Sequence, residues 1–326
     1  MKASIKTIAS LAKVSPTTVS FVMNGKGDEH NIAEETQRRI LEIAKKLNYK
    51  ANFAARCLST GRTHTIGLVV PDVSNPFFAN IVRKIEYYAE QKGYSVLITN
   101  TDENVKKEKE ILKALINRQV EGIIIAPTEA ISQNFDQIPI VVFDRIHPSQ
   151  KTNFVNINNQ ETAFALTDHL FKQGHKKVAL LSLTSFLPNI KERIEGYKQA
   201  CLQNHVEIDN NLIIEIKNHN KKEDLKKALK SLFFSKTPVT AVLFLNNVLA
   251  AKSIWIINTC FKALSKDLSL ASFDNLDIFD YTEPKITSAL QPSEMISKCC
   301  VELLYELVEH DRSEPGIFFK TQLIIR

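Results

Sequence analysis

The chain has 326 residues, of which 44% are hydrophobic and 24% are charged. This length exceeds what one hydrophobic core usually fills, so we expect two or three domains, and the composition excludes a mostly disordered or collagen-like chain. The start is interrupted by Lys6, Ser10 and Lys13, and no later apolar run approaches the roughly 18 residues of a membrane span. Five cysteines show no C-x-x-C spacing. We therefore expect a cytoplasmic protein without a membrane segment, a disulfide framework or a zinc site.

The excess positive charge is confined to the N-terminal fifth of the chain. Residues 1–62 carry 11 Lys and Arg against 5 Asp and Glu, whereas residues 63–326 carry 31 of each kind. Because polyphosphate attracts Lys and Arg through counterion release, a small basic head on a neutral body is typical of a nucleic-acid-binding module joined to a larger domain. A solvated basic surface is the alternative, and charge alone does not separate the two.

Residues 4–47 show the pattern of three amphipathic helices. Ser4 can cap the first helix, and Ser15 followed by Pro16 signals the start of the second. Apolar residues share one face in each helix: Ile8, Leu11 and Ala12, then Val19, Val22 and Met23, then Ile40, Ile43, Ala44 and Leu47. A tight turn between the first two predicts a helix-turn-helix whose second helix fits a major groove. A generic helical bundle would show the same pattern.

From residue 65 onward, short runs rich in Ile and Val alternate with amphipathic helical stretches. This alternation predicts parallel sheets covered on both faces by helices, with strands at 66–70, 94–98, 122–126, 140–143, 177–181, 241–245 and 268–273. Two such units would form a cleft, and ligands of open α/β sheets bind at the carboxyl ends of the strands. The polar residues that follow these runs are Asp72, Asp144, Arg145, Asn246, Asn247 and Asp274.

An ordered set of motifs runs along the chain. It includes Ile5-Lys6-Thr7-Ile8-Ala9, Val14-Ser15-Pro16-Thr17-Thr18-Val19-Ser20-Phe21-Val22-Met23-Asn24, Leu47-Asn48-Tyr49, Ile66-Gly67-Leu68-Val69-Val70-Pro71 and Asn75-Pro76-Phe77-Phe78. This set resembles the LacI/GalR family of bacterial transcriptional regulators over essentially the whole chain. The resemblance implies an N-terminal all-α helix-turn-helix head with a hinge helix. It also implies an α/β body of two doubly wound parallel-sheet subdomains similar to periplasmic sugar-binding proteins.

The resemblance also implies domain boundaries. Residues 1–50 would form the DNA-binding head, 51–62 the hinge helix and linker, and 63–326 the effector-binding and dimerisation domain. Subdomain 1 would take about 63–158 and 291–316, and subdomain 2 about 159–290 and 317–326. The sequence shows no terminal heptad segment, so we expect a homodimer rather than a tetramer held by a coiled coil.

By motif position, the resemblance assigns DNA contacts to residues of the head and hinge. Base reading falls to Pro16, Thr17 and Phe21, with Phe21 limited to apolar contacts such as a thymine methyl or, alternatively, placed in the core. The remaining expected DNA contacts are Ser15, Thr18, Ser20, Asn24, Ala55 and Leu58. Residues 52–59 are too few for a stable isolated helix, so we expect them to order on DNA with Leu58 as a minor-groove wedge. A linker leucine packed on the body is the alternative.

The resemblance places an effector site in the cleft. Arg193 would bind the effector, unless it forms a surface salt bridge instead. Phe77 and Phe78 would stack on the effector, unless one of the two packs in the core. The expected effector-binding residues are Phe77, Phe78, Arg145, Asn158, Arg193, Asn246 and Asp274. Asn158 and Asn247 stand where the family usually has aspartate. This predicts a less negative site that favours a sugar acid over a neutral sugar. The alternative is that both asparagines bind the same sugar hydroxyls that aspartates at these positions would bind.

Three family positions differ in the head: Thr7 replaces the usual aspartate, Lys13 the usual glycine, and Phe21 a frequent arginine. The loop from Gly25 to Asn31 is also longer than usual. These departures leave the operator sequence open.

No catalytic constellation is recognisable, because G-x-S-x-G, Walker and H-E-x-x-H motifs are all missing. His169 and His175 flank a helix end and suit its dipole better than a metal. We therefore expect no enzyme, cofactor or metal, but a repressor that binds double-stranded operator DNA under control of a carbohydrate or sugar-acid effector. A sugar-binding transport protein is one alternative, which would require a signal peptide. A cleft-based α/β enzyme with an accessory helical domain is another, which would require a nucleophile or an acid/base pair.

Overall fold

The structure is a computed structural model that describes residues 4–49, 61–129, 137–147, 149, 153–183, 186–216 and 222–326. The chain divides into two compact units, residues 1–63 and residues 64–326. Ala55 and Leu58, the two expected DNA contacts of the hinge, lie outside the described residues.

The head consists of three helices: α1 (Ile5–Ala12), α2 (Pro16–Met23) and α3 (Glu34–Lys46). The hydroxyl of Ser4 accepts from the backbone N–H of Thr7, and Ser15 accepts from Thr18, so both predicted caps are present. The three helices enclose a core of Ile8, Ala9, Ala12, Val19, Val22, Ile40 and Ala44. The predicted helix-turn-helix is therefore confirmed.

One predicted core residue of the head is wrong. Leu11 is 58% exposed, whereas Ile8, Ala9 and Ala12 are buried. Successive helical residues are separated by about 100°, so the buried arc runs from Ile8 through Ala12 to Ala9 and Leu11 lies beyond its edge. The two small alanines let α1 approach its neighbours closely on that side.

Lys13 ends α1 in the left-handed conformation, with φ of 55°. A Cβ atom in this conformation costs about 1 kcal/mol, and glycine avoids that cost. We expect Lys13→Gly to stabilise the head by about 1 kcal/mol, and native-state hydrogen exchange of the α1 and α3 amides in the full chain should slow about fivefold. Lys13→Ala keeps the Cβ atom and should leave exchange unchanged. Equal effects of both substitutions would contradict this explanation.

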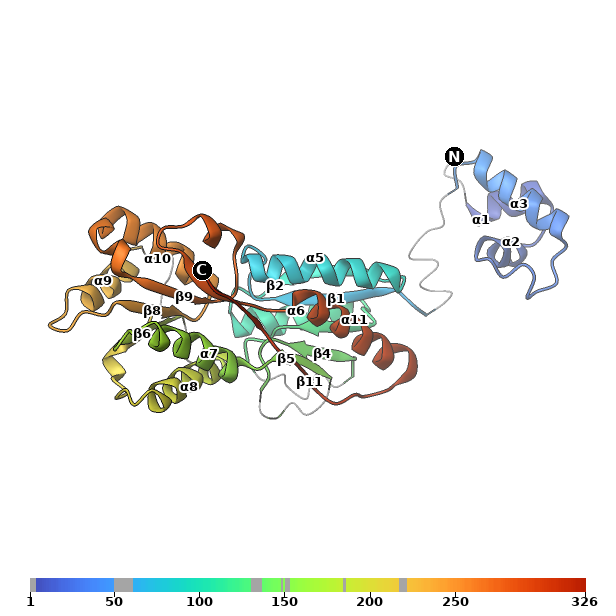
Figure 1. Cartoon of the computed structure of the whole chain (residues 1–326). Coiled ribbons are helices and arrows are strands. Elements are labelled where there is room, and N and C mark those ends of the chain that lie inside the picture. The colour runs from blue at the N-terminus through green and yellow to red at the C-terminus, as the bar shows by residue number, and fades with distance from the viewer. Residues whose placement is uncertain are drawn as a thin grey trace. The chain divides into compact units, whose positions relative to one another are not determined.

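The body contains two six-stranded sheets (Figure 1), ordered β11-β5-β4-β3-β1-β2 and β12-β10-β9-β8-β6-β7. The first sheet comprises β1 (Thr65–Val70), β2 (Ser95–Asn100), β3 (Gly122–Ile125), β4 (Ile140–Phe143), β5 (Phe154–Ile157) and β11 (Ile317–Phe319). The second comprises β6 (Val178–Ser182), β7 (Ile213–Glu215), β8 (Ala241–Phe244), β9 (Ser269–Phe273), β10 (Ile286–Leu290) and β12 (Gln322–Ile324). Neighbouring strands are parallel, except that β12 runs antiparallel to β10. The predicted pair of parallel-sheet subdomains is confirmed.

Helices cover both faces of each sheet. The first sheet packs against α5 (Pro76–Gln91), α6 (Val105–Asn117) and α11 (Ser293–His310), and the second against α7 (Asn159–Lys172), α8 (Pro188–Gln203), α9 (Lys222–Phe233) and α10 (Asn247–Cys260). Short 3-10 helices span Asn210–Leu212, Lys262–Asp267 and Asp277–Tyr281. The sequence of β1 is continuously apolar because both faces of the strand are buried. Leu68 packs against the layer of α5 and α11, whereas its neighbour Val69 packs against α6 on the other face.

The predicted boundary between residues 316 and 317 requires correction. Ile317–Phe319 forms β11, which pairs in parallel with β5 of the first sheet. The chain enters the second sheet only with β12, which pairs with β10. Five short strands were also not predicted: β5, β7, β10, β11 and β12. Polar residues such as Thr287 and Ser288 in β10 are buried there and interrupt the apolar pattern that would have revealed the strand.

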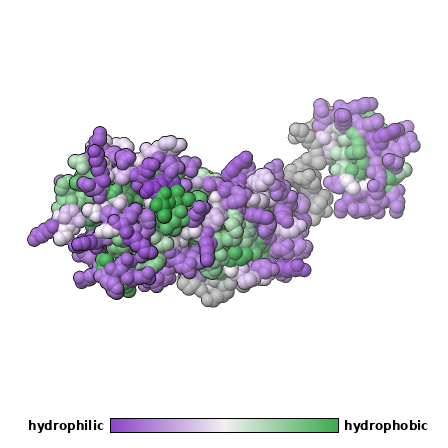
Figure 2. All heavy atoms as spheres, viewed as in Figure 1, coloured by the Kyte–Doolittle hydropathy of each residue, from purple (hydrophilic) through white to green (hydrophobic). Residues whose placement is uncertain are grey.

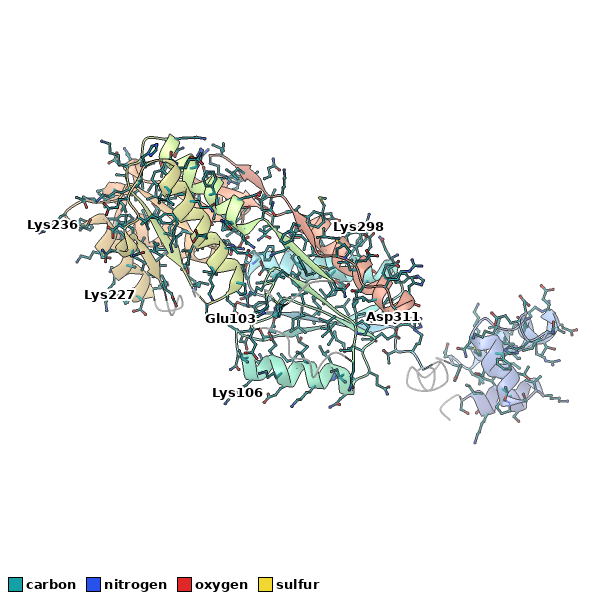
Figure 3. The ribbon with its side chains drawn as sticks, turned by 90° about the horizontal axis from the view of Figure 1, so that it is seen from below. Glu103, Lys106, Lys227, Lys236, Lys298 and Asp311 are labelled. Atoms are coloured by element: carbon teal, nitrogen blue, oxygen red, sulfur yellow. The ribbon has the colours of Figure 1, made fainter. Side chains whose placement is uncertain are left out.

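Hydrophilic side chains cover much of the visible surface of each unit (Figure 2). Lys106 on α6 and Lys227 on α9 are exposed and point outward (Figure 3), as expected of solvated helix faces. Among the described helices, none combines the length and the apolar character that a membrane crossing requires.

Candidate DNA-binding surface and effector cleft

The outer face of α2 carries most of the residues expected to contact DNA. Val19 and Val22 are buried on the opposite side of the helix. The expected contacts Ser15, Pro16, Thr17 and Asn24 are exposed, and Thr18, Ser20 and Phe21 are half-buried. The Ser15 and Thr18 hydroxyls lie 2.8 Å apart and fix the start of the helix. A short helix with an exposed polar face is the arrangement that enters a major groove in helix-turn-helix proteins.

Phe21 does not join the core of the head. Its ring instead stacks on that of His30, with centroids 3.5 Å apart. The alternative that Phe21 is a core residue therefore fails, and its ring remains at the edge of the candidate DNA-binding face.

In the body, the two adjacent aromatic residues at the start of α5 have different environments. Asn75 caps this helix by accepting from the backbone N–H of Phe77 at 3.0 Å. Phe78 is 5% exposed and packs edge-on to Phe143, so it belongs to the core. Phe77 lines a cavity of about 160 Å³ together with residues of the second sheet. Of the two, Phe77 is placed to contact a ligand.

Arg193 on α8 is buried where the two subdomains meet, so the surface salt-bridge alternative fails. Its guanidinium lies 3.5 Å above the centroid of the Phe273 ring. Arg193 Nε donates to Asn159 Oδ1 at 2.9 Å, and Nη1 donates to the carbonyl oxygen of Leu245 at 2.8 Å. Burial lowers the pKa of Arg193, although the nearby carboxylates oppose this effect. The side chain is thus rigidly held with its charge surrounded by acceptors.

Asp144, directly after β4, links the first sheet to α8 of the second. Its Oδ1 lies 3.8 Å from Arg193 Nη2, and its Oδ2 accepts from Asn189 Nδ2 at 3.3 Å. We call these three residues, Asp144, Asn189 and Arg193, the clasp. A second link joins Asn247 Nδ2 to Asn75 Oδ1 at 3.2 Å. One buried and one partly buried set of polar contacts therefore bridges the two subdomains directly.

Arg145 is paired within the first subdomain. Its Nη1 and Nη2 donate to the two carboxylate oxygens of Glu103, at 2.6 Å each. Burial lowers the pKa of Arg145, but the hydrogen bonds and charge of Glu103 outweigh this and raise it. Figure 3 shows Glu103 beside the N-terminal end of α6. The bidentate pair engages both terminal nitrogens of Arg145.

Asp274 follows β9 with a left-handed φ of 65° and is buried. Gln291 Nε2 donates to its Oδ1 at 2.5 Å. Burial raises the pKa of Asp274 to about 6, with Asp144 adding to the shift and Arg193 and Gln291 opposing it. Asp274 also lines the 160 Å³ cavity, opposite Phe77. A carboxylate and an aromatic ring thus meet at one small cavity between the subdomains.

The two expected asparagines serve as local helix-start groups. Asn158 Nδ2 donates to Glu161 Oε2 at 2.8 Å, and Asn246 Oδ1 accepts from the backbone N–H of Leu249 at 2.8 Å. Their neighbours Asn159 and Asn247 are buried and make the contacts to Arg193 and Asn75. Sequence reasoning missed Asn159 as a site residue because the preceding strand β5 was not predicted.

The balance of charge at the cleft differs from the sequence-based expectation. Two guanidinium groups, of Arg145 and Arg193, lie among five carboxyl groups, those of Glu103, Glu108, Asp144, Glu192 and Asp274. An anionic ligand would therefore meet repulsion as well as attraction. This arrangement does not favour a sugar acid over a neutral sugar.

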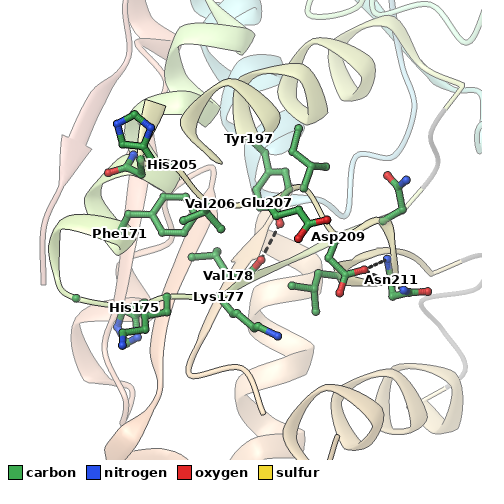
Figure 4. A pocket seen from close by; sticks show the side chains of 16 residues that line it. Phe171, His175, Lys177, Val178, Tyr197, His205, Val206, Glu207, Asp209 and Asn211 are labelled. Carbon is green, nitrogen blue, oxygen red and sulfur yellow. Dashed lines mark hydrogen bonds between the residues drawn. The ribbon is translucent and has the colours of Figure 1, made fainter. Parts of the chain in front are cut away.

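A larger cavity of about 870 Å³ lies elsewhere, beside the C-terminal ends of α7 and α8 (Figure 4). Several of its polar groups already have partners. The Tyr197 hydroxyl donates to the carbonyl oxygen of Val178, and Asp209 accepts from Asn211. It contains none of the expected effector-binding residues, so the cleft remains the candidate effector site.

Comparison with known proteins assigns both parts of the chain. Residues 4–52 match "Bacterial regulatory proteins, lacI family", and residues 63–316 match "Periplasmic binding proteins and sugar binding domain of LacI family". An HTH-type transcriptional repressor PurR of Aliivibrio fischeri is 30% identical over 97% of this chain and 95% of its own.

Two solved structures share the fold over nearly the full length. The Lac repressor dimer bound to operator and the anti-inducer ONPF has a TM-score of 0.85 at 19% identity, covering 100% of this chain and 98% of its own. The complex of the transcriptional regulator CelR with cellobiose has a TM-score of 0.69 at 21% identity, covering 99% of both chains. The chain therefore belongs to the LacI family of bacterial regulatory proteins, as a DNA-binding transcriptional repressor.

Proposed function

We propose that this repressor acts as a homodimer whose operator affinity is set by a neutral, hydroxyl-rich small molecule bound in the cleft. The observation that carries the proposal is the convergence of Arg193, Asp274 and Phe77 between the two subdomains. A ligand that contacts both subdomains favours one arrangement of them over others, and this difference in affinity couples the cleft to the head.

The chemistry of the cleft suits a carbohydrate. Adjacent ring hydroxyls both donate and accept, so they match the donors of Arg193 and the acceptor Asp274. The ring of Phe77 offers an apolar face to the carbon skeleton of a sugar. The carboxylates around Arg193 would repel a negatively charged ligand. The family match to a sugar-binding domain and the CelR–cellobiose complex support this ligand class.

Titration calorimetry of the full chain tests the ligand class. Matched pairs of a neutral sugar and its uronic acid differ mainly in one negative charge. We expect the neutral member of each binding pair to bind more tightly, and Phe77→Ala to weaken its binding. Consistently tighter binding of the uronic acids would contradict the charge argument, and failure of every sugar to bind would contradict the ligand class.

For the head, we propose that residues 1–50 bind double-stranded operator DNA and that residues 51–62 contact its minor groove through Ala55 and Leu58. The operator can be obtained by selection from random DNA with the full-length chain. We expect operator affinity to fall steeply with salt, by a slope of about −0.9 in log K against log salt for each phosphate contacted. An affinity independent of salt would contradict the proposed electrostatic contact.

Leu58→Gly tests the hinge separately. The substitution removes an apolar wedge from the minor groove, so specific binding should weaken far more than binding to random DNA. Ligand affinity in the same variant serves as the control and should be unchanged. Equal losses on operator and random DNA would contradict the wedge.

A further inference from the structure

The loop between α2 and α3 has a defined conformation in the structure. The backbone N–H of Lys26 donates to the Phe21 carbonyl oxygen at 2.8 Å, and that of Ile32 donates to Gly27 at 2.9 Å. These two bonds close the loop at both ends. The backbone of the loop is therefore held in one conformation beside the C-terminal end of α2.

A side chain of α3 secures the middle of this loop. Gln37 Nε2 donates to Asp28 Oδ1 and to the Ile32 carbonyl oxygen, at 2.8 Å each. The amide of Gln37 packs so closely against Gly27 that a Cβ atom there would lie 2.2 Å from Gln37 Oε1. Only glycine fits this contact without displacing the glutamine. Gln37 on α3 thus holds the part of the loop that follows Gly27 in place.

The loop places an imidazole ring on Phe21. The rings of Phe21 and His30 are stacked, with centroids 3.5 Å apart and planes 19° apart. Phe21 follows Thr17 by four residues and precedes Asn24 by three, so the three side chains share one face of α2. His30 is exposed beside this face. The stack therefore belongs to the candidate DNA-binding surface and not to the core.

We propose that His30 is a positioning residue, which holds the Phe21 ring in one orientation so that it reads a thymine methyl in the major groove. This inference rests on the proposed operator binding. A phenylalanine side chain on a helix surface has several rotamers, and stacking on the imidazole of His30 favours one of them. Ordering the ring before binding reduces the entropy lost in the complex. The contact would distinguish thymine from cytosine, which lacks the methyl group.

The test is a sequence selection with the full-length chain, followed by affinity measurements on single-base variants of the selected operator. Phe21→Leu identifies the operator position that the ring reads. At that position, we expect His30→Ala to reduce the preference for thymine over cytosine about five- to tenfold. His30→Phe keeps a ring that can stack and should retain the preference within about twofold. In Phe21→Leu, adding His30→Ala should have little further effect, because the two residues act through one contact.

Each other outcome identifies a different role. A uniform loss over all sequences in His30→Ala, with the salt slope smaller by about one per head, would show a phosphate contact and overturn the proposal. Unchanged base preferences would show that His30 supports only the loop, and would also overturn it. Hydrogen exchange of the α1 and α3 amides checks that the head of each variant stays folded. If the wild-type chain selects no sequence at all, the proposed operator binding fails first.

Discussion

Arg193→Met is expected to lower the free energy of unfolding of the body by about 3–5 kcal/mol at pH 7, the cost typical of removing one partner from a buried ion pair. Arg193 is 3% exposed and lies among Asp144, Asp274 and Glu192, which all raise its pKa against the effect of burial. Without the guanidinium, Asp144 is left with Arg145, whose Nε lies 3.6 Å from Asp144 Oδ2, and Asp274 loses the positive charge that lowers its pKa. Methionine retains an unbranched apolar stem over Phe273, so the loss reports on charge more than on packing.

Urea unfolding of the full chain measures this loss. Lys191→Met on the same helix is the matched control, because Lys191 is exposed and its removal should change stability by less than about 0.5 kcal/mol. The effect of Arg193→Met should shrink toward pH 4, because burial raises the pKa values of Asp274 and Glu192 and these two carboxyl groups take up protons as the pH falls. A loss below about 1 kcal/mol at pH 7 would mean that the clasp contributes little to holding the subdomains together.

The parts of the fold that the sequence predicts are those whose burial leaves an unbroken apolar run. Residues 122–125 and 141–143 are buried in the first sheet, Ile140 is half-buried, and all of these residues apart from Gly122 carry apolar side chains. By contrast, β5 contains the buried Asn156 and β10 the buried Ser288. Hydrogen bonds to groups distant in sequence, such as that from Ser288 to Asn275, make such burial tolerable, and a local pattern cannot reveal them.

In the candidate site, too, some residues could be predicted from the local sequence and others could not. The rule that ligands bind at the carboxyl ends of parallel strands points to Asp144 and Asp274, and both lie at the cleft. Their partners were not predictable in this way. Glu103 comes from the loop after β2 and Gln291 from the segment after β10, and only the tertiary fold brings each to its partner. The charge of a site depends on such partners, which is why Asn158 and Asn247, in place of the family's aspartates, suggested an anionic ligand.

Between pH 7 and pH 4, the stability of the wild-type chain should rise by about 2 kcal/mol relative to that of Asp274→Asn, which is most of the linkage energy of a pKa difference of about two units. Burial raises the pKa of Asp274 to about 6 in the folded chain, whereas an unfolded aspartate titrates near 4. Between these values the folded state holds more protons than the unfolded state, so stability falls as the pH rises from 4 to 6. Above about pH 7 the carboxyl group is ionised in both states and the difference is constant.

Asparagine has nearly the same shape as aspartate and can still accept from Gln291, but it does not titrate. The raised pKa values of Glu108 and Glu192 are common to both chains and cancel in the difference. Asp280→Asn is the control of opposite sign. The hydrogen bond from Arg326 lowers the pKa of Asp280, so its contribution to stability is lost as the pH falls.

Urea unfolding at intervals between pH 4 and pH 7 measures the difference between wild type and Asp274→Asn, and a flat difference would contradict a raised pKa for Asp274. Protonation of Asp274 should also weaken binding of the proposed effector. A ligand hydroxyl that donates to the Asp274 carboxylate competes with the proton for the same oxygen atoms. Effector affinity in the wild-type chain should therefore fall below about pH 6, in step with the titration of Asp274.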